Sequence, residues 1–245
     1  MISDDGRYVA FLSRANDRVA NDTNGTTQDV FVRDLVTGTT TLVSVNSSGT
    51  GSGDRLSTSP AISGNGRYIT FSSAASNLVA NDTNNTSDVF VRDLVTGTTT
   101  LVSANTSGTG SGDRGSSVFE ISDDGRYVLF SSTASNLVSN DTNGNALDWF
   151  VRDLQLGTTT LVSINHANTG SGNNSGSFRR AGESAVISGN GRYVAFGSFV
   201  SDLVATDTNG NVDVFVRDLV AGTTTYQRQR NWYEQWQPRL LHCWH

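Results

Sequence analysis

The sequence predicts an all-β protein of the β-propeller class, and three observations support this prediction. One unit occurs four times in the 245 residues, and its Arg-Tyr pair places tyrosines at Tyr8, Tyr68, Tyr127 and Tyr193. The copies follow one another at steps of 60, 59 and 66 residues. Each copy contains four short apolar or β-branched stretches separated by turn residues. Four antiparallel strands in about 60 residues make a propeller blade with enlarged loops, whereas a β-solenoid coil is shorter and a sandwich does not repeat its sequence.

The second copy contains the predicted elements in order. A short apolar strand at 61–63 is followed by an Asn-Gly turn, a strong hairpin signal because both residues accept positive φ. The strand RYITFSS at 67–73 comes next, then a long polar loop, then DVFVRDL at 88–94. A Thr-Gly turn leads into the β-branched strand TTTLVS at 98–103, and a second long loop follows. Because strand direction alternates, both tight turns lie at one end of every blade and both long loops lie at the other.

The motifs of the repeat resemble those of a known family. ISDDGRYVAFLS at 2–13 and DVFVRDLVTGTTTLVS at 29–44 are similar to the TolB-like propeller repeat, a relative of the WD repeat. In that repeat Ser-x-Asp-Gly precedes a strand that ends in Ala-Phe-x-Ser. The resemblance covers the chain up to Thr225, although the proline usual before Asp-Gly is absent. It implies four-stranded blades at about 1–58, 59–117, 118–183 and 184–225, and a periplasmic or secreted location.

The propeller is expected to be incomplete. Four blades are the lower limit for a closed propeller, and Met1-Ile2-Ser3 starts partway through a strand of the repeat. A parent protein with more blades would make this chain an open arc with apolar faces at both ends, which predicts self-association.

The tail at 226–245 does not follow the repeat. Thr225 should be followed by Leu-Val-Ser, but the chain reads YQRQRNWYEQWQPRLLHCWH, with three of the four tryptophans and the only cysteine. Tryptophan has one codon, which becomes a glycine codon when read from its second base. Trp232 and Trp236 stand at the positions of Gly49 and Gly53, so we predict that this tail results from a shifted reading frame. A genuine C-terminal extension is the alternative, and the encoding DNA distinguishes the two.

Charge and composition exclude some partners. The chain has 17 basic residues, all arginine, against 23 acidic ones, and a formal charge of −6 argues against nucleic acid. No apolar run approaches the roughly 20 residues of a membrane span. We therefore expect a protein or carbohydrate partner, bound at the end of the blades where the variable polar loops gather.

No catalytic residues are predicted. Outside the tail His166 is the only histidine, no Gly-x-Ser-x-Gly motif occurs, and a fourfold-repeated aspartate is more typical of structure than of a single catalytic centre. The sequence thus predicts a non-catalytic binding or scaffolding module. The alternative is the propeller part of a larger secreted hydrolase, a peptidase or a glycosidase, whose catalytic domain lies elsewhere.

The VRDL motif receives a structural interpretation. Asp34, Asp93, Asp153 and Asp218 precede the second hairpin, where aspartate bonds turn amides. The preceding arginines are expected to pair with acids between blades, and the phenylalanines of the same strand are expected to fill the core between blades. These residues are Arg33, Arg92, Arg152 and Arg217, and Phe31, Phe90, Phe150 and Phe215.

The loop before each DVFV strand has the pattern of a metal site. Asp-x-Asn is followed six or seven residues after the first aspartate by a second aspartate, and hard cations such as calcium prefer oxygen ligands. An earlier polar residue, Asp17, Asn77, Asn136 or Asp202, offers a further oxygen. Asn and Asp also close loops without metal by bonding their own backbone, so both interpretations stay open. The candidate calcium ligands are Asp22, Asn24 and Asp29; Asp82, Asn84 and Asp88; Asp141, Asn143 and Asp148; Asp207, Asn209 and Asp213.

Overall fold

The structure is a computed structural model that describes residues 1–173, 185–208 and 210–227. In these residues all regular structure is β, with fifteen strands in four antiparallel sheets, which confirms the predicted fold class. Three sheets have four strands each and the first has three. In the first sheet Ile2 forms an isolated bridge with Val9, at the position where Ile62 pairs with Ile69 in the second sheet.

The strands of each sheet follow one another in chain order. The first sheet contains β1 (Tyr8–Ser13), β2 (Asp29–Asp34) and β3 (Thr39–Leu42). The second contains β4 (Ser57–Ile62), β5 (Tyr68–Ser73), β6 (Asp88–Asp93) and β7 (Thr98–Leu101). The third contains β8 (Ser116–Ile121), β9 (Tyr127–Ser132), β10 (Asp148–Asp153) and β11 (Thr158–Leu161). The fourth contains β12 (Ala185–Ile187), β13 (Tyr193–Ser198), β14 (Asp213–Asp218) and β15 (Thr223–Gln227).

Two boundaries differ from the expected blade divisions. β4 starts at Ser57 and β8 at Ser116, before the expected blade starts at 59 and 118. β15 continues past Thr225, and Tyr226 pairs with Phe215 as Leu42 pairs with Phe31 in the first sheet. The rest of the predicted frame-shifted tail, 228–245, lies outside the described residues.

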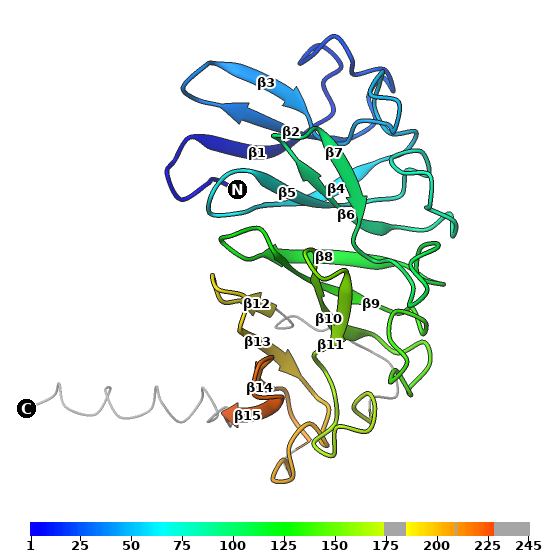
Figure 1. Ribbon diagram of the computed structural model, residues 1–245, viewed down its shortest axis with the longest axis vertical. Coiled ribbons are helices and arrows are strands. Elements are labelled where there is room, and N and C mark those ends of the chain that lie inside the picture. The colour runs from blue at the N-terminus through cyan, green and yellow to red at the C-terminus, as the bar shows by residue number, and fades with distance from the viewer. Residues whose placement is uncertain (174–184, 209, 228–245) are drawn as a thin grey trace, which may run out of the picture.

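The four sheets lie side by side as blades in an open arc (Figure 1). The first strands of neighbouring blades contact one another, β1 with β4, β4 with β8, and β8 with β12. The first and fourth blades lie at opposite ends of the arc, so the blades form an incomplete propeller (Figure 1).

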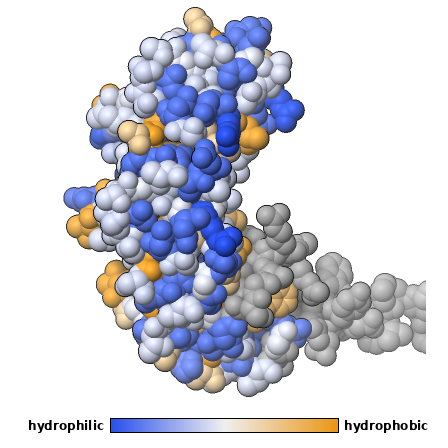
Figure 2. All heavy atoms as spheres, turned by 90° about the vertical axis from the view of Figure 1, so that its right-hand side faces the viewer, coloured by the Kyte–Doolittle hydropathy of each residue, from blue (hydrophilic) through white to orange (hydrophobic). Residues whose placement is uncertain are grey.

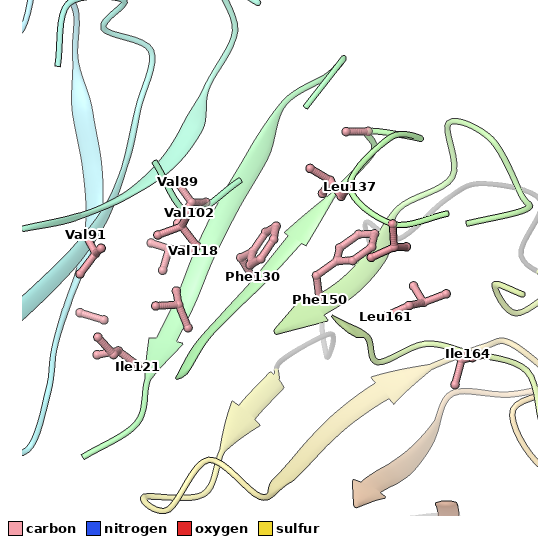
Figure 3. Packing of buried hydrophobic residues seen from close by; sticks show 14 residues of the cluster. Val89, Val91, Val102, Val118, Ile121, Phe130, Leu137, Phe150, Leu161 and Ile164 are labelled. Atoms are coloured by element: carbon pink, nitrogen blue, oxygen red, sulfur yellow. The ribbon is translucent and has the colours of Figure 1, made fainter. Parts of the chain in front are cut away.

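The hydrophobic core lies between blades rather than inside them. Figure 3 shows Val89 and Val102 of the second blade directed toward Phe130 of the third. Each blade also stacks two phenylalanines of adjacent strands on one another, such as Phe130 of β9 on Phe150 of β10 at 5.6 Å between ring centroids. Burying aromatic rings contributes most to such a core. Phe31, Phe90, Phe150 and Phe215 are fully buried. Phe90, Phe150 and Phe215 lie in clusters formed by two blades, as predicted, whereas the cluster around Phe31 contains residues of the first blade alone.

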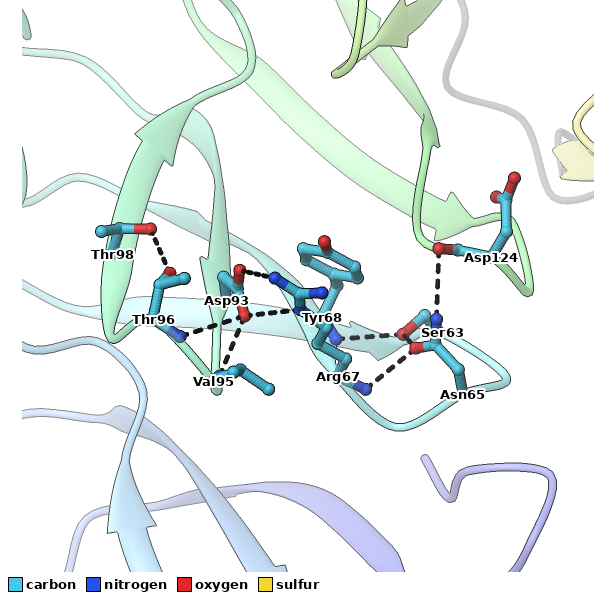
Figure 4. A network of polar contacts seen from close by, with 9 residues as sticks. All are labelled: Ser63, Asn65, Arg67, Tyr68, Asp93, Val95, Thr96, Thr98 and Asp124. Carbon is cyan, nitrogen blue, oxygen red and sulfur yellow. Dashed lines mark hydrogen bonds and ion pairs between the residues drawn. The ribbon is translucent and has the colours of Figure 1, made fainter.

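The tight turns also join one blade to the next. Asn65 in the β4–β5 turn donates from Nδ2 to the carbonyl of Asp124 in the next blade at 3.1 Å (Figure 4). The ring of Tyr68 packs against Gly125 in the β8–β9 turn of the next blade, where φ is +78°. Glycine is required here because the backbone is left-handed and the tyrosine ring occupies the space of a side chain.

An ion pair closes each blade at the tight-turn end. Arg67 donates from Nε and Nη2 to both oxygens of Asp93, at 2.9 and 2.7 Å (Figure 4). Asp93 also accepts the amide of Val95 at 2.9 Å, as predicted for the VRDL aspartate. The guanidinium lies 4.9 Å above the centroid of the Tyr68 ring. The hydrogen bonds from Arg67 hold the pKa of Asp93 well below its ordinary value, although burial opposes this effect.

The depressed pKa of Asp93 predicts a loss of stability in acid. Its contribution is fully present above the unfolded-state pKa of about 3.9 and is lost as the pH falls toward the folded-state value. We expect Asp93→Asn to destabilise the chain by about 1 kcal/mol at pH 7 and by less at pH 3, where part of the contribution is lost. Urea denaturation at both pH values measures this. Asp17→Asn, at an exposed position, serves as the control, and an Asp93→Asn deficit that is unchanged at pH 3 would contradict the prediction.

Candidate functional site in the long loops

In the first three blades the two long loops lie together at the same end of each blade, as the alternation of strands predicted. Ser52 Oγ in the later loop donates to Asp22 Oδ1 in the earlier loop at 2.9 Å. Asn24 Nδ2 donates to the carbonyl of Gly53 at 2.9 Å. The second and third blades repeat both contacts. This end of the molecule faces the viewer in Figure 2, where its described surface is mostly polar.

The second aspartate of each candidate site is the first residue of a strand, namely of β2, β6, β10 or β14. Asp29, Asp88 and Asp213 are 0% exposed and Asp148 is 2% exposed. In the first three blades one carboxylate oxygen accepts a hydrogen bond from the hydroxyl of a serine that lies just past the end of the last strand of the blade. These bonds are Ser44 to Asp29 at 2.7 Å, Ser103 to Asp88 at 2.6 Å and Ser163 to Asp148 at 2.6 Å.

Most of the remaining oxygens of the motif have no partner, whereas Asn84 Oδ1 accepts the amide of Thr86 at 2.8 Å. In the described part of the chain ten buried side-chain atoms lack a hydrogen bond, and seven of them belong to the candidate metal ligands. Buried polar atoms are almost always paired in folded proteins, so this concentration marks the site as unusual. The seven atoms are Asn24 Oδ1, Asp29 Oδ2, Asp82 Oδ2, Asp88 Oδ2, Asp141 Oδ2, Asn143 Oδ1 and Asp148 Oδ2.

The site brings negative charges together in a buried place. Burial raises the pKa of Asp88 to about 7, Ser103 opposes this rise, and the charge of Asp82 adds to it. Burial likewise raises the pKa of Asp148 to about 7, and Asp141 contributes in the same way. Two carboxylates and one amide oxygen per blade suit a hard cation. Among the described residues, no three or more His, Cys, Asp or Glu side chains are grouped so that they could hold a metal ion by themselves.

The structure therefore brings together the predicted residues of the first three blades. In the fourth blade Asp207 and Asp213 are buried, whereas Asn209 lies outside the described residues. The earlier polar residues are used differently. Asn77 Oδ1 accepts the amide of Asp54 from the preceding blade at 3.0 Å, so this side chain holds two blades together.

Sequence reasoning missed the serines that position the carboxylates. The amide of Val30 donates to Ser44 Oγ at 3.1 Å, and that hydroxyl in turn donates to Asp29. The signal was present, because the serine follows the aspartate by 15 residues in each of the first three copies, while the spacing inside the Asp-x-Asn loop varies.

The prediction for the VRDL arginines is wrong. Among the described residues their guanidinium groups form no ion pair; all four ion pairs use the arginine of the Arg-Tyr motif instead. Arg92 donates to Thr99 Oγ1 at 3.0 Å, and Arg152 makes the same bond with Thr159. The aspartate at the end of each VRDL strand is bound instead by the arginine of the Arg-Tyr motif.

Three of these arginines line grooves between blades, and Arg217 lines the same groove as Arg152. One groove of about 500 Å³ contains Arg92 and lies between Asn46–Gly49 of the first blade and β7 of the second. Another of about 580 Å³ contains Arg152 beside Gly108. At the next interface Asn168 replaces this glycine, and its Oδ1 accepts from Arg217 Nη2 at 3.2 Å. Burial lowers the pKa of Arg92 and of Arg152, as expected for partly desolvated cations.

These features define a β-propeller module with repeated loop sites, and solved structures agree with this class. No protein-family model and no curated protein sequence matches the chain. The chain has a TolB-like propeller fold: it matches the putative TolB from Agrobacterium tumefaciens over 92% of its length, with 15% identity and a TM-score of 0.50. It matches the β-propeller domain of the Trilobed protease from Pyrococcus furiosus over 92%, with 12% identity and a TM-score of 0.51. TolB from Acinetobacter baumannii matches over 92%, with 15% identity and a TM-score of 0.49.

The chain spans 62%, 55% and 41% of the lengths of these three structures, so the likeness concerns the fold alone. No helix long and apolar enough to cross a membrane occurs in the residues that the structure describes.

Proposed function

We propose that this chain is a non-catalytic binding module whose inter-blade grooves accept carboxylate groups of a partner. The observation that supports this most directly is the repeated, half-buried arginine that forms no ion pair, because the aspartate next to it is bound by the arginine of the Arg-Tyr motif. Arg92 and Arg152 each use one nitrogen for a threonine hydroxyl and form no ion pair in the described structure. A partly desolvated guanidinium without a direct ion pair is unfavourable, and a bound carboxylate would relieve that cost.

Arginine suits this task because its planar guanidinium presents several donors that match a carboxylate. Polar residues line part of each groove, as Thr98 and Ser47 do beside Arg92. Acidic side chains of a protein and uronic acids of a polysaccharide share this carboxylate chemistry. The proposal therefore includes both kinds of partner, and the experiment separates them.

A fluorescence polarisation assay tests the proposal with two labelled probes, an oligoglutamate peptide and an oligogalacturonate. We expect one probe to bind, and the double variant Arg92→Gln/Arg152→Gln to weaken that binding by about tenfold or more, equal to about 1.4 kcal/mol. Gly108→Asn copies the natural arrangement at Asn168 and should weaken binding by occupying Arg152. Asparagine tolerates the positive φ of 68° at Gly108, so this variant is expected to fold.

Arg18→Gln, at an exposed loop position, is the matched control for loss of one positive charge. The proposal fails if neither probe binds at millimolar concentration, or if Arg18→Gln weakens binding as much as the double variant does.

A second candidate is favoured by the likeness to the propeller domain of a protease. In that case the same grooves would belong to a secreted hydrolase whose catalytic domain lies outside this sequence. Peptidase and glycosidase assays on the full-length gene product test this candidate. A periplasmic or secreted location belongs to both candidates, and fractionation of cells that express the full gene measures it.

A further inference from the structure

We infer that each of the first three blades binds one calcium ion between its Asp-x-Asn loop and the first residue of the strand that follows this loop. The ligands in the first blade, for example, are Asp22, Asn24 and Asp29. This inference is independent of the groove proposal, because the two sites share no residues.

The first argument is the set of unpartnered oxygens. In the second blade Asp82 Oδ2 and Asp88 Oδ2 are both buried and without a hydrogen bond. Asp88 is entirely buried, and its other oxygen is held by Ser103. A buried carboxylate without a counter-charge is strongly unfavourable, and a cation between the two removes that penalty.

The second argument concerns the alternative, loop closure without metal. In that alternative the aspartates would accept amides of their own loop. In the first blade serines take this role instead, since the amide of Thr23 donates to Ser52 Oγ at 3.1 Å. The amide of Val30 donates to Ser44 Oγ. Each aspartate receives one serine hydroxyl, which orients the carboxylate and leaves its other oxygen for a ligand.

The third argument selects calcium among hard cations. Calcium accepts six to eight oxygens in an adaptable shell, whereas magnesium demands a small octahedron. The first and second aspartates are seven residues apart at Asp22 and Asp29 but six apart at Asp82 and Asp88, and the larger ion tolerates this variation. With only two carboxylates per site the expected dissociation constant is about 10⁻⁴–10⁻³ M, the range of extracellular modules.

Calcium would connect three segments of a blade. Its ligands come from the earlier long loop and from the start of the strand that follows it. The serine bonded to each aspartate lies just past the last strand of the blade or in the later long loop. Removing the ion is therefore expected to loosen the polar end of the arc before the core between blades opens.

The test uses the full chain, stripped with a chelator and dialysed. Calorimetric titration with calcium chloride is expected to give at least three ions per chain. Thermal unfolding in 10 mM calcium is expected to show a midpoint about 5 °C or more above that in chelator. An equal rise with 10 mM magnesium would overturn the choice of calcium.

Asp88→Asn keeps the shape of the side chain and removes its charge. If the site binds calcium, this variant lowers the stoichiometry by one and has a lower midpoint than the wild type in calcium. In chelator the order reverses, because the variant no longer buries an uncompensated charge. The matched control Asp124→Asn lies in a tight turn at the other end of the blade and should leave stoichiometry unchanged. Absence of binding heat and of a calcium-dependent shift would overturn the inference.

Discussion

Replacing Phe130 by alanine is expected to lower the free energy of unfolding by about 3–5 kcal/mol. Phe130 is 0% exposed, stacks on Phe150 at 5.6 Å, and lies in the cluster that joins the second and third blades. The substitution removes the ring from both its own sheet and the interface to the neighbouring blade. The resulting cavity cannot collapse easily, because β-strands on both sides fix its walls.

Urea denaturation followed by circular dichroism measures this loss. Leu156→Ala is the control, since Leu156 is 67% exposed and its truncation should change stability by less than about 0.5 kcal/mol. Equal losses for the two variants would show that the interface cluster does not hold the blades together.

Gly125→Ala is expected to destabilise the chain by about 2–4 kcal/mol, for two separate reasons. The backbone at Gly125 has a φ of +78°, which disfavours any side chain. In addition, a methyl group there would collide with the ring of Tyr68 from the preceding blade. The tyrosine or the turn must then move, and the hydrogen bond from Asn65 to Asp124 weakens with it.

Gly6→Ala separates the two reasons. Gly6 occupies the same position of the same turn in the first blade, with a φ of +71°, but nothing lies within 4 Å of the position of its Cβ. We expect Gly6→Ala to lower the free energy of unfolding by about 1 kcal/mol, the cost of the backbone conformation alone. If Gly125→Ala loses no more than Gly6→Ala in urea denaturation, the tyrosine contact contributes nothing.

Most of the fold was predictable because the sequence states it four times. Repetition identified the hairpin turns at Gly66 and Gly125 and the core role of Phe90 without any structure. The start of β4 was not predictable. Ser57 and Thr58 have no alternating apolar pattern, and the register shifts between Thr58 and Ala61, so the first half of the strand looked like loop.

The candidate metal site was predictable in its ligands but not in its supports. Asp22 and Asn24 follow a pattern whose chemistry can be read directly. Whether those oxygens have other partners depends on serines 15 and about 30 residues away, whose approach is set by the pairing of strands. The prediction for the VRDL arginines failed for a similar reason, because strand register decides which of two arginines reaches Asp93. Tyr68 pairs directly with Asp93, which places Arg67 beside this aspartate.

The sameness of the blade interfaces has a consequence for the history of the gene. The amide-to-carbonyl bond between tight turns recurs from Asp4 to Gly64, from Asn65 to Asp123 and from Asp123 to Gly189. A newly duplicated unit would therefore meet a complementary surface on both sides at once, without any compensating substitution. Unequal recombination can lengthen or shorten such an array by one unit in a single step. Near-identical neighbouring repeats are what recent events of this kind would leave behind.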